Sequence, residues 1–230
     1  MKLSRTMWIL ALLLVLTPLA HADGTTTMQF TGVNGANDGQ YFVSPYTGTM
    51  NYGTSHAQTV GLFCDDINND VYIGEVWTAN VTNLASGNLS NTRYGSSTDH
   101  NPNYVNAAAS LKLYEEAAWI VTQFASHPSD YVSLQYALWD LMTPGAEPTN
   151  YAGGDGVKVS QWLTWAGQNY GSINPSNFEI ITNVGTLQYR GQVQEFIVQT
   201  PEPATVVLLL IGISSMFLLA LKRQRQPVAA

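Results

Sequence analysis

The order of hydrophobic patterns constrains the fold of this chain most strongly: a helical block stands between two strand-rich segments. Apolar side chains recur at spacings of three and four over residues 104–124, and they fall on one face over residues 131–142, as in amphipathic helices. Pro128 separates the two helices because proline cannot continue a helix, and a third, shorter helix is predicted over residues 157–165. The sequence therefore predicts an α+β fold in which β-rich N- and C-terminal parts, sandwich- or barrel-like, flank a helical insert.

Strands and turns are predicted on both sides of the helical block. Alternation of apolar and polar residues is typical of half-buried strands, and clusters of Gly, Asn and Ser are typical of turns. Turns are predicted at residues 46–48 and 51–53, and a surface loop at residues 83–103. The predicted strands cover residues 27–30, 40–43, 59–64, 70–82, 178–181, 186–189 and 194–198.

The N-terminus has the pattern of a secretory signal peptide over residues 1–22. Two basic residues precede an apolar run at residues 7–16, and small residues precede a predicted cleavage site between Ala22 and Asp23. This pattern predicts removal by signal peptidase and export of the remaining chain. An uncleaved membrane anchor is the alternative, and the shortness of the apolar run disfavours it.

The C-terminus carries a second targeting pattern. Pro201, Glu202 and Pro203 are followed by residues 204–221, which carry no charge, and then by a basic cluster at residues 222–225. A helix over residues 204–221 would span about 27 Å at about 1.5 Å per residue, close to the hydrocarbon thickness of a bilayer. The basic cluster would stay on the cytoplasmic side and leave the preceding domain outside.

This C-terminal arrangement resembles the PEP-CTERM sorting signal of Gram-negative bacteria that make exopolysaccharide. The resemblance covers residues 201–230 and implies recognition by an exosortase, after transient anchoring of the transmembrane helix in the inner membrane. It also implies removal of the tail and delivery to the cell surface or to the extracellular matrix of a biofilm. An ordinary single-span anchor is the alternative, and it keeps the same topology.

Charge narrows the classes of partner for the segment between the two targeting patterns. The whole chain has a formal net charge of -7, and residues 23–200 contain 15 acidic and 4 basic residues. Binding to nucleic acid requires basic residues opposite the phosphates, so this balance argues against a nucleic-acid partner. An acidic surface instead suits an exported domain that stays soluble by charge repulsion.

Cys64 is the only cysteine, which is unusual in an exported protein because such proteins tend to pair their cysteines. It ends the apolar predicted strand at residues 59–64 and is followed directly by Asp65 and Asp66. Burial and neighbouring carboxylates are expected to raise the pKa of the thiol above its usual value of about 8.5. A free nucleophile is therefore disfavoured, and a cysteine committed to a covalent bond fits better.

Two short motifs resemble the thioester domains of bacterial surface adhesins. The first is Phe63-Cys64 in a predicted strand, and the second is Gln-x-Ala-Leu-Trp at residues 135–139, at the start of a predicted helix. The resemblance spans residues 59–142. It implies that Cys64 supplies the sulfur and Gln135 the acyl group of an internal thioester. It further implies a cell-surface protein that captures an amine, such as a lysine of a surface protein or of a polysaccharide-associated partner.

Such a bond places physical demands on the fold. An amide does not acylate a thiol spontaneously, so the protein must hold the sulfur against the carbonyl carbon, where effective molarities reach about 10⁵–10⁸ M. The N–H groups in the first turn of the helix are expected to polarise the Gln135 oxygen. Aromatic side chains are expected to shield the bond from water. The predicted shielding residues are Phe63, Tyr136, Trp139 and Trp119.

The predicted chemistry is a single covalent capture, so the chain is not expected to be an enzyme and needs no cofactor. The alternative from another class is a non-covalent matrix or carbohydrate-binding protein. In that reading Cys64 is a buried structural residue and Gln135 lies on the solvent face of its helix.

Other chemistry-bearing residues favour structural roles. Residues 66–70 match the start of an EF-hand loop, but the sixth and twelfth positions do not, so a polar turn is preferred and no metal site is predicted. The histidines have no metal-ligand spacing. Glu115 and Glu116 are interpreted as a solvated helix face, and Trp162 and Trp165 as core residues rather than a sugar-stacking platform.

Overall fold

The structure is a computed structural model that describes residues 23–95, 106–145, 156–185 and 192–200. The chain divides into two units, residues 1–199 and residues 200–230, and every element described below belongs to the first. The predicted signal peptide, the motif at Pro201, Glu202 and Pro203, and the predicted transmembrane helix at residues 204–221 lie outside the described residues. Within the described residues, no helix combines the length and apolar character needed to cross a membrane.

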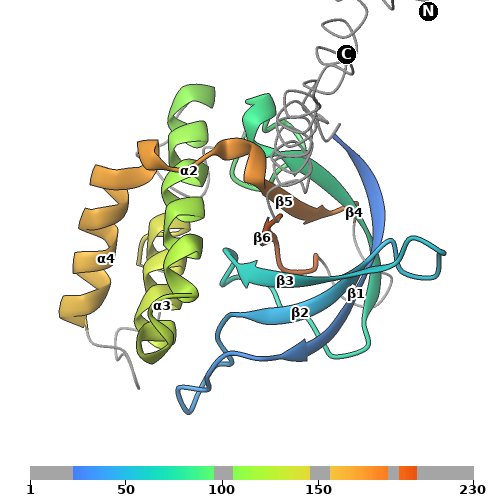
Figure 1. Ribbon diagram of the computed structural model, residues 1–230, viewed down its shortest axis with the longest axis horizontal. Helices are drawn as coiled ribbons and strands as arrows, with labels where there is room; N and C mark the ends of the chain where they lie inside the picture. Colours follow the sequence, from blue (N-terminus) through green and yellow to red (C-terminus); the bar gives the residue numbers. More distant parts are fainter. Residues whose placement is uncertain (1–22, 96–105, 146–155, 186–191, 201–230) are drawn as a thin grey trace, which may run out of the picture. The chain divides into compact units, whose positions relative to one another are not determined.

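Six strands of the described chain close into an antiparallel barrel (Figure 1). The order around the barrel is β1-β2-β3-β6-β5-β4, so the last strand lies between strands from the two halves of the sequence. This order pairs Cys64 with Phe196 across β3 and β6. The strands are β1 (Gly24–Val33), β2 (Tyr46–Met50), β3 (Gln58–Cys64), β4 (Val76–Asn83), β5 (Phe178–Asn183) and β6 (Phe196–Gln199).

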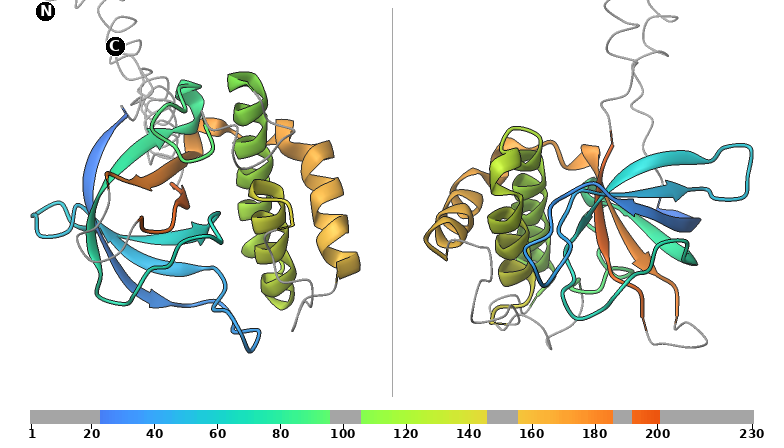
Figure 2. Two further views of the ribbon diagram at one scale, coloured as in Figure 1. Left: turned by 180° about the vertical axis from the view of Figure 1, so that it is seen from behind. Right: turned by 90° about the horizontal axis from the view of Figure 1, so that it is seen from below.

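Three α-helices of the described chain stand between β4 and β5 in the sequence and form a layer beside the barrel (Figures 1 and 2). They are α2 (Ala107–Phe124), α3 (Tyr131–Met142) and α4 (Gly156–Asn169). The Asn106 side chain caps α2 by accepting a hydrogen bond from the Ala109 N–H at 3.0 Å. Helix α2 packs against β6 and α3 packs against β3, while α4 covers the outer side of α2 and α3.

Short 3₁₀ turns complete the described chain. They are η1 (Leu84–Ser86), η2 (Pro128–Asp130), η3 (Tyr170–Ser172) and η4 (Pro175–Asn177).

Aromatic side chains fill the barrel. The ring of Phe196 on β6 lies 6.2 Å from that of Phe30 on β1 and 6.2 Å from that of Trp77 on β4. Tyr46 on β2 joins this group, with its ring 5.5 Å from Phe30. Burial of each such side chain contributes roughly 1.5–3 kcal/mol, so residues from four strands stabilise one another in the interior.

The α+β prediction, with β-rich ends flanking a helical insert, is confirmed, and the β part is a barrel. The predicted strand at residues 40–43 is wrong: this segment contains only an isolated bridge between Asn37 and Phe42. The neighbouring strand β2 covers residues 46–50, where a turn was predicted at residues 46–48. Pairing with β1 on one side and β3 on the other overrides the turn-like composition of β2.

The region before β4 also differs from the prediction. The strand predicted over residues 70–82 begins only at Val76, and Ile73, which lies within the predicted range, is 71% exposed. The loop predicted on the surface at residues 83–103 is buried in part, since Leu89 and Tyr94 belong to the core. The strand predicted at residues 186–189 lies outside the described residues.

A buried ion pair joins the turn after β3 to the segment after η1. Arg93 Nη1 lies 2.5 Å from Asp66 Oδ2, and the two side chains are 7% and 0% exposed. Arg93 also donates to the Val193 carbonyl at 2.8 Å and to Asn183 Oδ1 at 3.0 Å. One side chain thus connects the turn that follows Cys64 to the approach of β6 and to the end of β5.

Removing the positive partner of this pair should destabilise the fold. Arg93→Met leaves the Asp66 carboxylate buried and uncompensated, and we expect the free energy of unfolding to fall by about 3–5 kcal/mol. Lys158→Met is the matched control, because it removes a pair with Asp130 in which Lys158 is 46% exposed. A change of at most about 1 kcal/mol is expected there. Urea unfolding measures both, and equal effects of the two variants would contradict the role of Arg93.

Candidate functional site

Cys64 is the last residue of β3 and its side chain is fully buried. Its backbone N–H donates to Ser44 Oγ at 2.9 Å, and its thiol donates to the Asp66 carbonyl at 3.3 Å. The indole N–H of Trp139 donates to the Cys64 sulfur at 3.5 Å. The sulfur is therefore enclosed and oriented by groups from the turn after β3 and from helix α3.

Gln135 lies beside Cys64, although 71 positions separate them in the sequence. Its Nε2 donates to the Cys64 carbonyl at 2.6 Å, and its Oε1 accepts from the Ser44 backbone N–H at 3.0 Å. The side chain is 0% exposed, so the alternative that places Gln135 on the solvent face of its helix is wrong. Both ends of the carboxamide are held by backbone groups, as a buried amide requires.

Ser44 is the site residue that sequence reasoning missed. It is fully buried in the loop before β2, and it contacts both predicted partners: its Oγ accepts from Cys64 and its N–H donates to Gln135. Gly35 allows this loop to fold back, because a Cβ at Gly35 would lie 1.9 Å from the Val43 carbonyl oxygen. A serine in a loop carries no signal in the sequence that distinguishes it from other serines.

The electrostatics of the site oppose ionisation of the thiol. Burial raises the pKa of Cys64 well above its usual value, and the charge of Asp66 raises it further. The predicted rise in pKa is confirmed. The sulfur therefore carries its proton at neutral pH and is not a free thiolate nucleophile.

The predicted shielding residues lie in two different places. Trp139 and Tyr136 are buried next to the site, with their rings 5.5 Å apart, and the Tyr136 hydroxyl donates to Asp38 Oδ2 at 2.5 Å. Phe63 packs against Phe124 of α2, with ring centroids 5.0 Å apart.

Trp119 packs toward α4, where its ring lies 6.3 Å from that of Trp162. The structure thus brings Cys64, Gln135, Tyr136 and Trp139 together, whereas the Phe63 side chain packs against α2 and the Trp119 side chain packs toward α4.

The other predicted candidates take structural roles. Asp66 is fully buried against Arg93, and it accepts hydrogen bonds from the Asn68 N–H at 3.0 Å and from the Asn69 side chain at 2.9 Å, as in the preferred polar turn. The described residues contain no group of three His, Cys, Asp or Glu able to hold a metal ion. His100 lies outside the described residues.

The predicted solvated face at Glu115 and Glu116 is wrong in part. Glu116 is 5% exposed and its carboxylate lies 3.4 Å from Lys112, one turn earlier on α2. Trp162 is buried, in agreement with its interpretation as a core residue. Trp165 is 37% exposed, with its ring 4.9 Å from that of Trp162, so the core interpretation does not extend to it.

Two further carboxyl groups are buried near Cys64. Glu195 accepts hydrogen bonds from the Tyr114 hydroxyl at 2.5 Å, from the Arg93 N–H at 2.7 Å and from the Thr182 hydroxyl. Asp65 is fully buried, and neither of its carboxyl oxygens has a hydrogen-bond partner among the described residues.

Burial raises the pKa of Asp65 well above its usual range, and the charges of Glu195 and Asp66 add to this effect. Burial raises the pKa of Glu195 as well, but its three hydrogen-bond donors oppose that rise, so Asp65 holds its proton in preference to Glu195.

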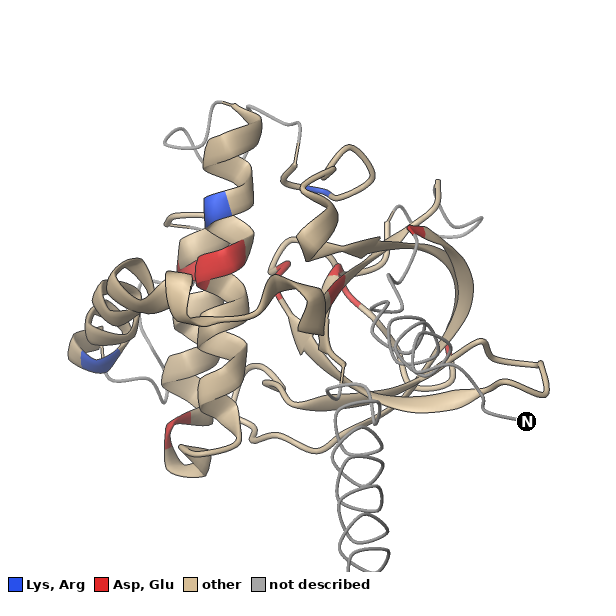
Figure 3. Cartoon of the chain, turned by 45° about the horizontal axis from the view of Figure 1, so that its top comes forward, with Lys and Arg blue, Asp and Glu red and all other residues tan. Residues whose placement is uncertain are grey.

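Acidic residues lie on the barrel as well as on the helices, while basic residues are few (Figure 3).

Asp65 should make stability depend on pH. The folded chain keeps a proton at Asp65 that the unfolded chain releases above about pH 4, so the free energy of unfolding should fall as the pH rises from that point. Asp65→Asn is neutral at every pH and should reduce the slope, by at most about 1.4 kcal/mol per pH unit for one proton.

Urea unfolding between pH 5 and pH 8 measures this slope. Asp70→Asn, which changes an exposed carboxylate, is the matched control and should leave the slope as it is in the unaltered protein. An unchanged slope in Asp65→Asn would show that Asp65 is ionised in the folded protein.

The chain matches no protein family and no curated protein. Among solved structures it is similar to the N-terminal thioester domain of a surface protein from Clostridium perfringens, with 8% sequence identity and a TM-score of 0.45. The similarity covers 77% of this chain and 99% of that one.

Proposed function

We propose that this chain is an exported surface or matrix protein in which Cys64 and Gln135 form an internal thioester that captures an amine of a partner. The observation that carries the proposal is the buried Gln135 carboxamide, held between the Cys64 carbonyl at 2.6 Å and the Ser44 N–H at 3.0 Å. A glutamine that served only to fill a helix face would not need to be desolvated at the residue that bears the chain's one thiol.

Formation of the bond follows from this arrangement. The Cys64 sulfur adds to the carbonyl carbon of Gln135, the carbon–nitrogen bond breaks, and the amide nitrogen leaves as ammonia with the proton of the thiol. Negative charge develops on Oε1 during the addition, and the Ser44 N–H is aimed at that atom. The sequence predicted a first-turn N–H of the helix as this donor. The Ser44 N–H takes that place, because Gln135 is the fifth residue of α3 and its side chain points at the loop before β2.

In the capture step a nitrogen replaces the sulfur on the Gln135 carbonyl carbon. A neutral amine adds to the Gln135 carbonyl, the carbon–sulfur bond breaks, and the sulfur leaves with a proton to restore the Cys64 thiol. The Trp139 N–H stabilises the sulfur as it departs. The product is an amide, which is more stable than the thioester, so each molecule captures one amine, as in adhesion and not as in enzymatic turnover.

The two chain ends supply the rest of the proposal. Residues 1–22 direct export through signal peptidase, and residues 201–230 direct sorting by an exosortase-type enzyme to the surface or exopolysaccharide matrix of a Gram-negative bacterium. The transmembrane helix predicted at residues 204–221 would hold the chain in the inner membrane before processing.

One observation favours a second function, in which Cys64 is only structural: its thiol already makes a hydrogen bond. The Cys64 S–H already donates to the Asp66 carbonyl at 3.3 Å in a fully buried position, which suits a structural cysteine in a non-covalent matrix or carbohydrate-binding protein. The two functions differ in the mass of the protein.

Intact mass of the purified protein tests the thioester. We expect a mass lower than the calculated one by about 17 Da, because one ammonia is lost when the acyl group transfers to sulfur. Methylamine should then add about 31 Da to this form and release a titratable thiol. Cys64→Ala and Gln135→Ala should lose both effects, and Gln123→Ala, an amide on α2, should keep both. A full calculated mass without a methylamine adduct would leave the structural cysteine as the explanation.

Trp139→Phe tests the role of the indole donor. The change keeps an aromatic ring against Tyr136 and removes the N–H that contacts sulfur, so capture of methylamine should slow by about tenfold, or about 1.4 kcal/mol in the barrier. Trp162→Phe, a buried tryptophan on α4, should leave the rate unchanged. Adduct formation followed by mass over time gives both rates, and an unaltered rate in Trp139→Phe would remove the indole from the mechanism.

A further inference from the structure

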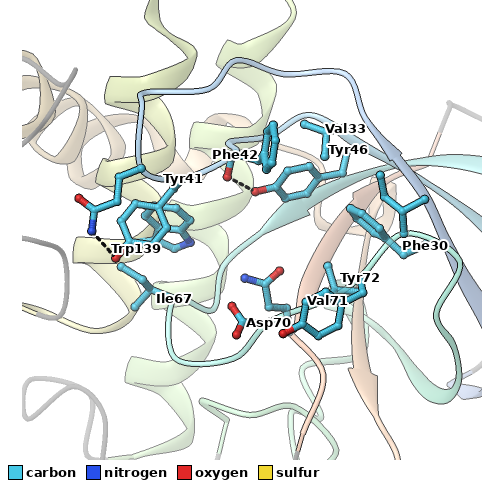
Figure 4. A pocket seen from close by; sticks show the side chains of 13 residues that line it. Phe30, Val33, Tyr41, Phe42, Tyr46, Ile67, Asp70, Val71, Tyr72 and Trp139 are labelled. Carbon is cyan, nitrogen blue, oxygen red and sulfur yellow. Dashed lines mark hydrogen bonds between the residues drawn. The ribbon is translucent and has the colours of Figure 1, made fainter. Parts of the chain in front are cut away.

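A pocket of about 800 Å³ opens beside the candidate site, with Trp139 in its wall (Figure 4). We propose that this pocket admits the lysine side chain of a partner protein and sets which amine reaches Gln135, an inference that rests on the proposed thioester. Its volume lies within the range of about 300–1,000 Å³ that is common for ligand sites. The pocket is lined by Phe30, Val33, Gln40, Tyr41, Phe42, Tyr46, Ile67, Asp70, Val71, Tyr72, Ile73, Trp139 and Gln194.

Trp139 connects the pocket to the sulfur. The same indole that lines the pocket donates its N–H to Cys64 Sγ at 3.5 Å. Tyr41 covers it from the loop before β2, with the two rings edge to face and their centroids 5.7 Å apart. A ligand in the pocket is therefore separated from the Cys64 sulfur by one side chain.

The chemistry of the wall favours a cation on an apolar stem. Aromatic rings come from β1, the loop before β2, β2 itself, the turn before β4 and helix α3, and ring faces attract an ammonium group. Asp70 is the one lining residue with a formal charge, and Figure 4 shows it at the edge of the pocket between Ile67 and Tyr72. The excess of acidic residues in residues 23–200, with 15 acidic and 4 basic, also favours a positively charged ligand.

The rim of the pocket exposes apolar surface that a ligand would cover. Phe42 is 59% exposed, Tyr72 60% and Ile73 71%. Large apolar side chains grouped at one opening are typical of a binding surface. The four methylene groups of lysine match the apolar side chains of this lining, which are Phe30, Val33, Phe42, Ile67, Val71 and Ile73.

In this arrangement the pocket concentrates the ammonium form of the lysine. The ammonium releases its proton to water, and the neutral amine then attacks the Gln135 carbonyl as described above. Methylamine carries no stem, so it gains little from the pocket. The ratio of the two capture rates therefore reports on the pocket alone.

The test compares N-acetyl-lysine methylamide with methylamine as probes on the full-length purified protein, with adduct formation followed by intact mass. We expect Phe42→Ala, Tyr72→Ala and Asp70→Asn each to lower the ratio of the lysine rate to the methylamine rate by about two- to fivefold. Tyr52→Ala, an exposed aromatic on the β2–β3 connection, and Asp140→Asn, an acid on α3, are the matched controls. Neither lines the pocket, and both should keep the ratio of the unaltered protein.

Three outcomes would overturn the proposal in different ways. An unchanged ratio in all pocket variants, with methylamine still captured, would reject the pocket and leave the thioester in place. If the pocket variants captured glucosamine more slowly than the unaltered protein but captured lysine at the same rate, the pocket would be assigned to a sugar amine and lysine would be rejected. No methylamine adduct in the unaltered protein would reject the thioester itself, and the pocket assignment with it.

Discussion

A buried carboxamide must make its hydrogen bonds inside the protein, and this constraint organises the site. Gln135 satisfies its N–H at the Cys64 carbonyl and its oxygen at the Ser44 N–H, so one side chain joins helix α3 to the end of β3 and to the loop before β2. Loss of either contact would leave a desolvated polar group without a partner. These two hydrogen bonds fix the position of α3 relative to the barrel at Cys64.

An ion pair in the turn after β3 also supports the site. Asp66 follows Cys64 in the turn after β3, and its pairing with Arg93 fixes the carbonyl that accepts the thiol proton. Burying both charges opposes folding unless the pair is well oriented, which is why Arg93 makes additional bonds to Val193 and Asn183. The same low-polarity surroundings that make this pair expensive keep the Cys64 thiol protonated. These surroundings disfavour an open nucleophile, and they would protect the proposed thioester from water.

Prediction from the sequence succeeded where the signal is local. The helix predicted at residues 131–142 is observed as Tyr131–Met142, because its apolar spacing and the proline before it act within a few residues. Strands were harder to predict, and β2 was missed because its Tyr-Thr-Gly-Thr-Met sequence has turn-like composition and is extended only through its two neighbours. The Cys64–Gln135 pair was predicted through resemblance of two motifs. No rule of spacing relates residues 71 positions apart.

The sequence by itself determined the alternation of strand-rich and helical segments, the acidic balance and the presence of one unpaired cysteine next to two carboxylates. These properties depend on composition and on neighbours along the chain. Tertiary structure decided that Ser44 contacts both candidate reactants, that Arg93 neutralises Asp66, and that aromatic residues from separate strands, loops and a helix line one pocket. Each of these contacts joins residues far apart in the sequence, and closure of the barrel and packing of α3 against β3 bring them together. The physical reason is that burial, which sets the pKa of Cys64 and forces Gln135 to find its partners, exists only once the barrel and the helices have packed.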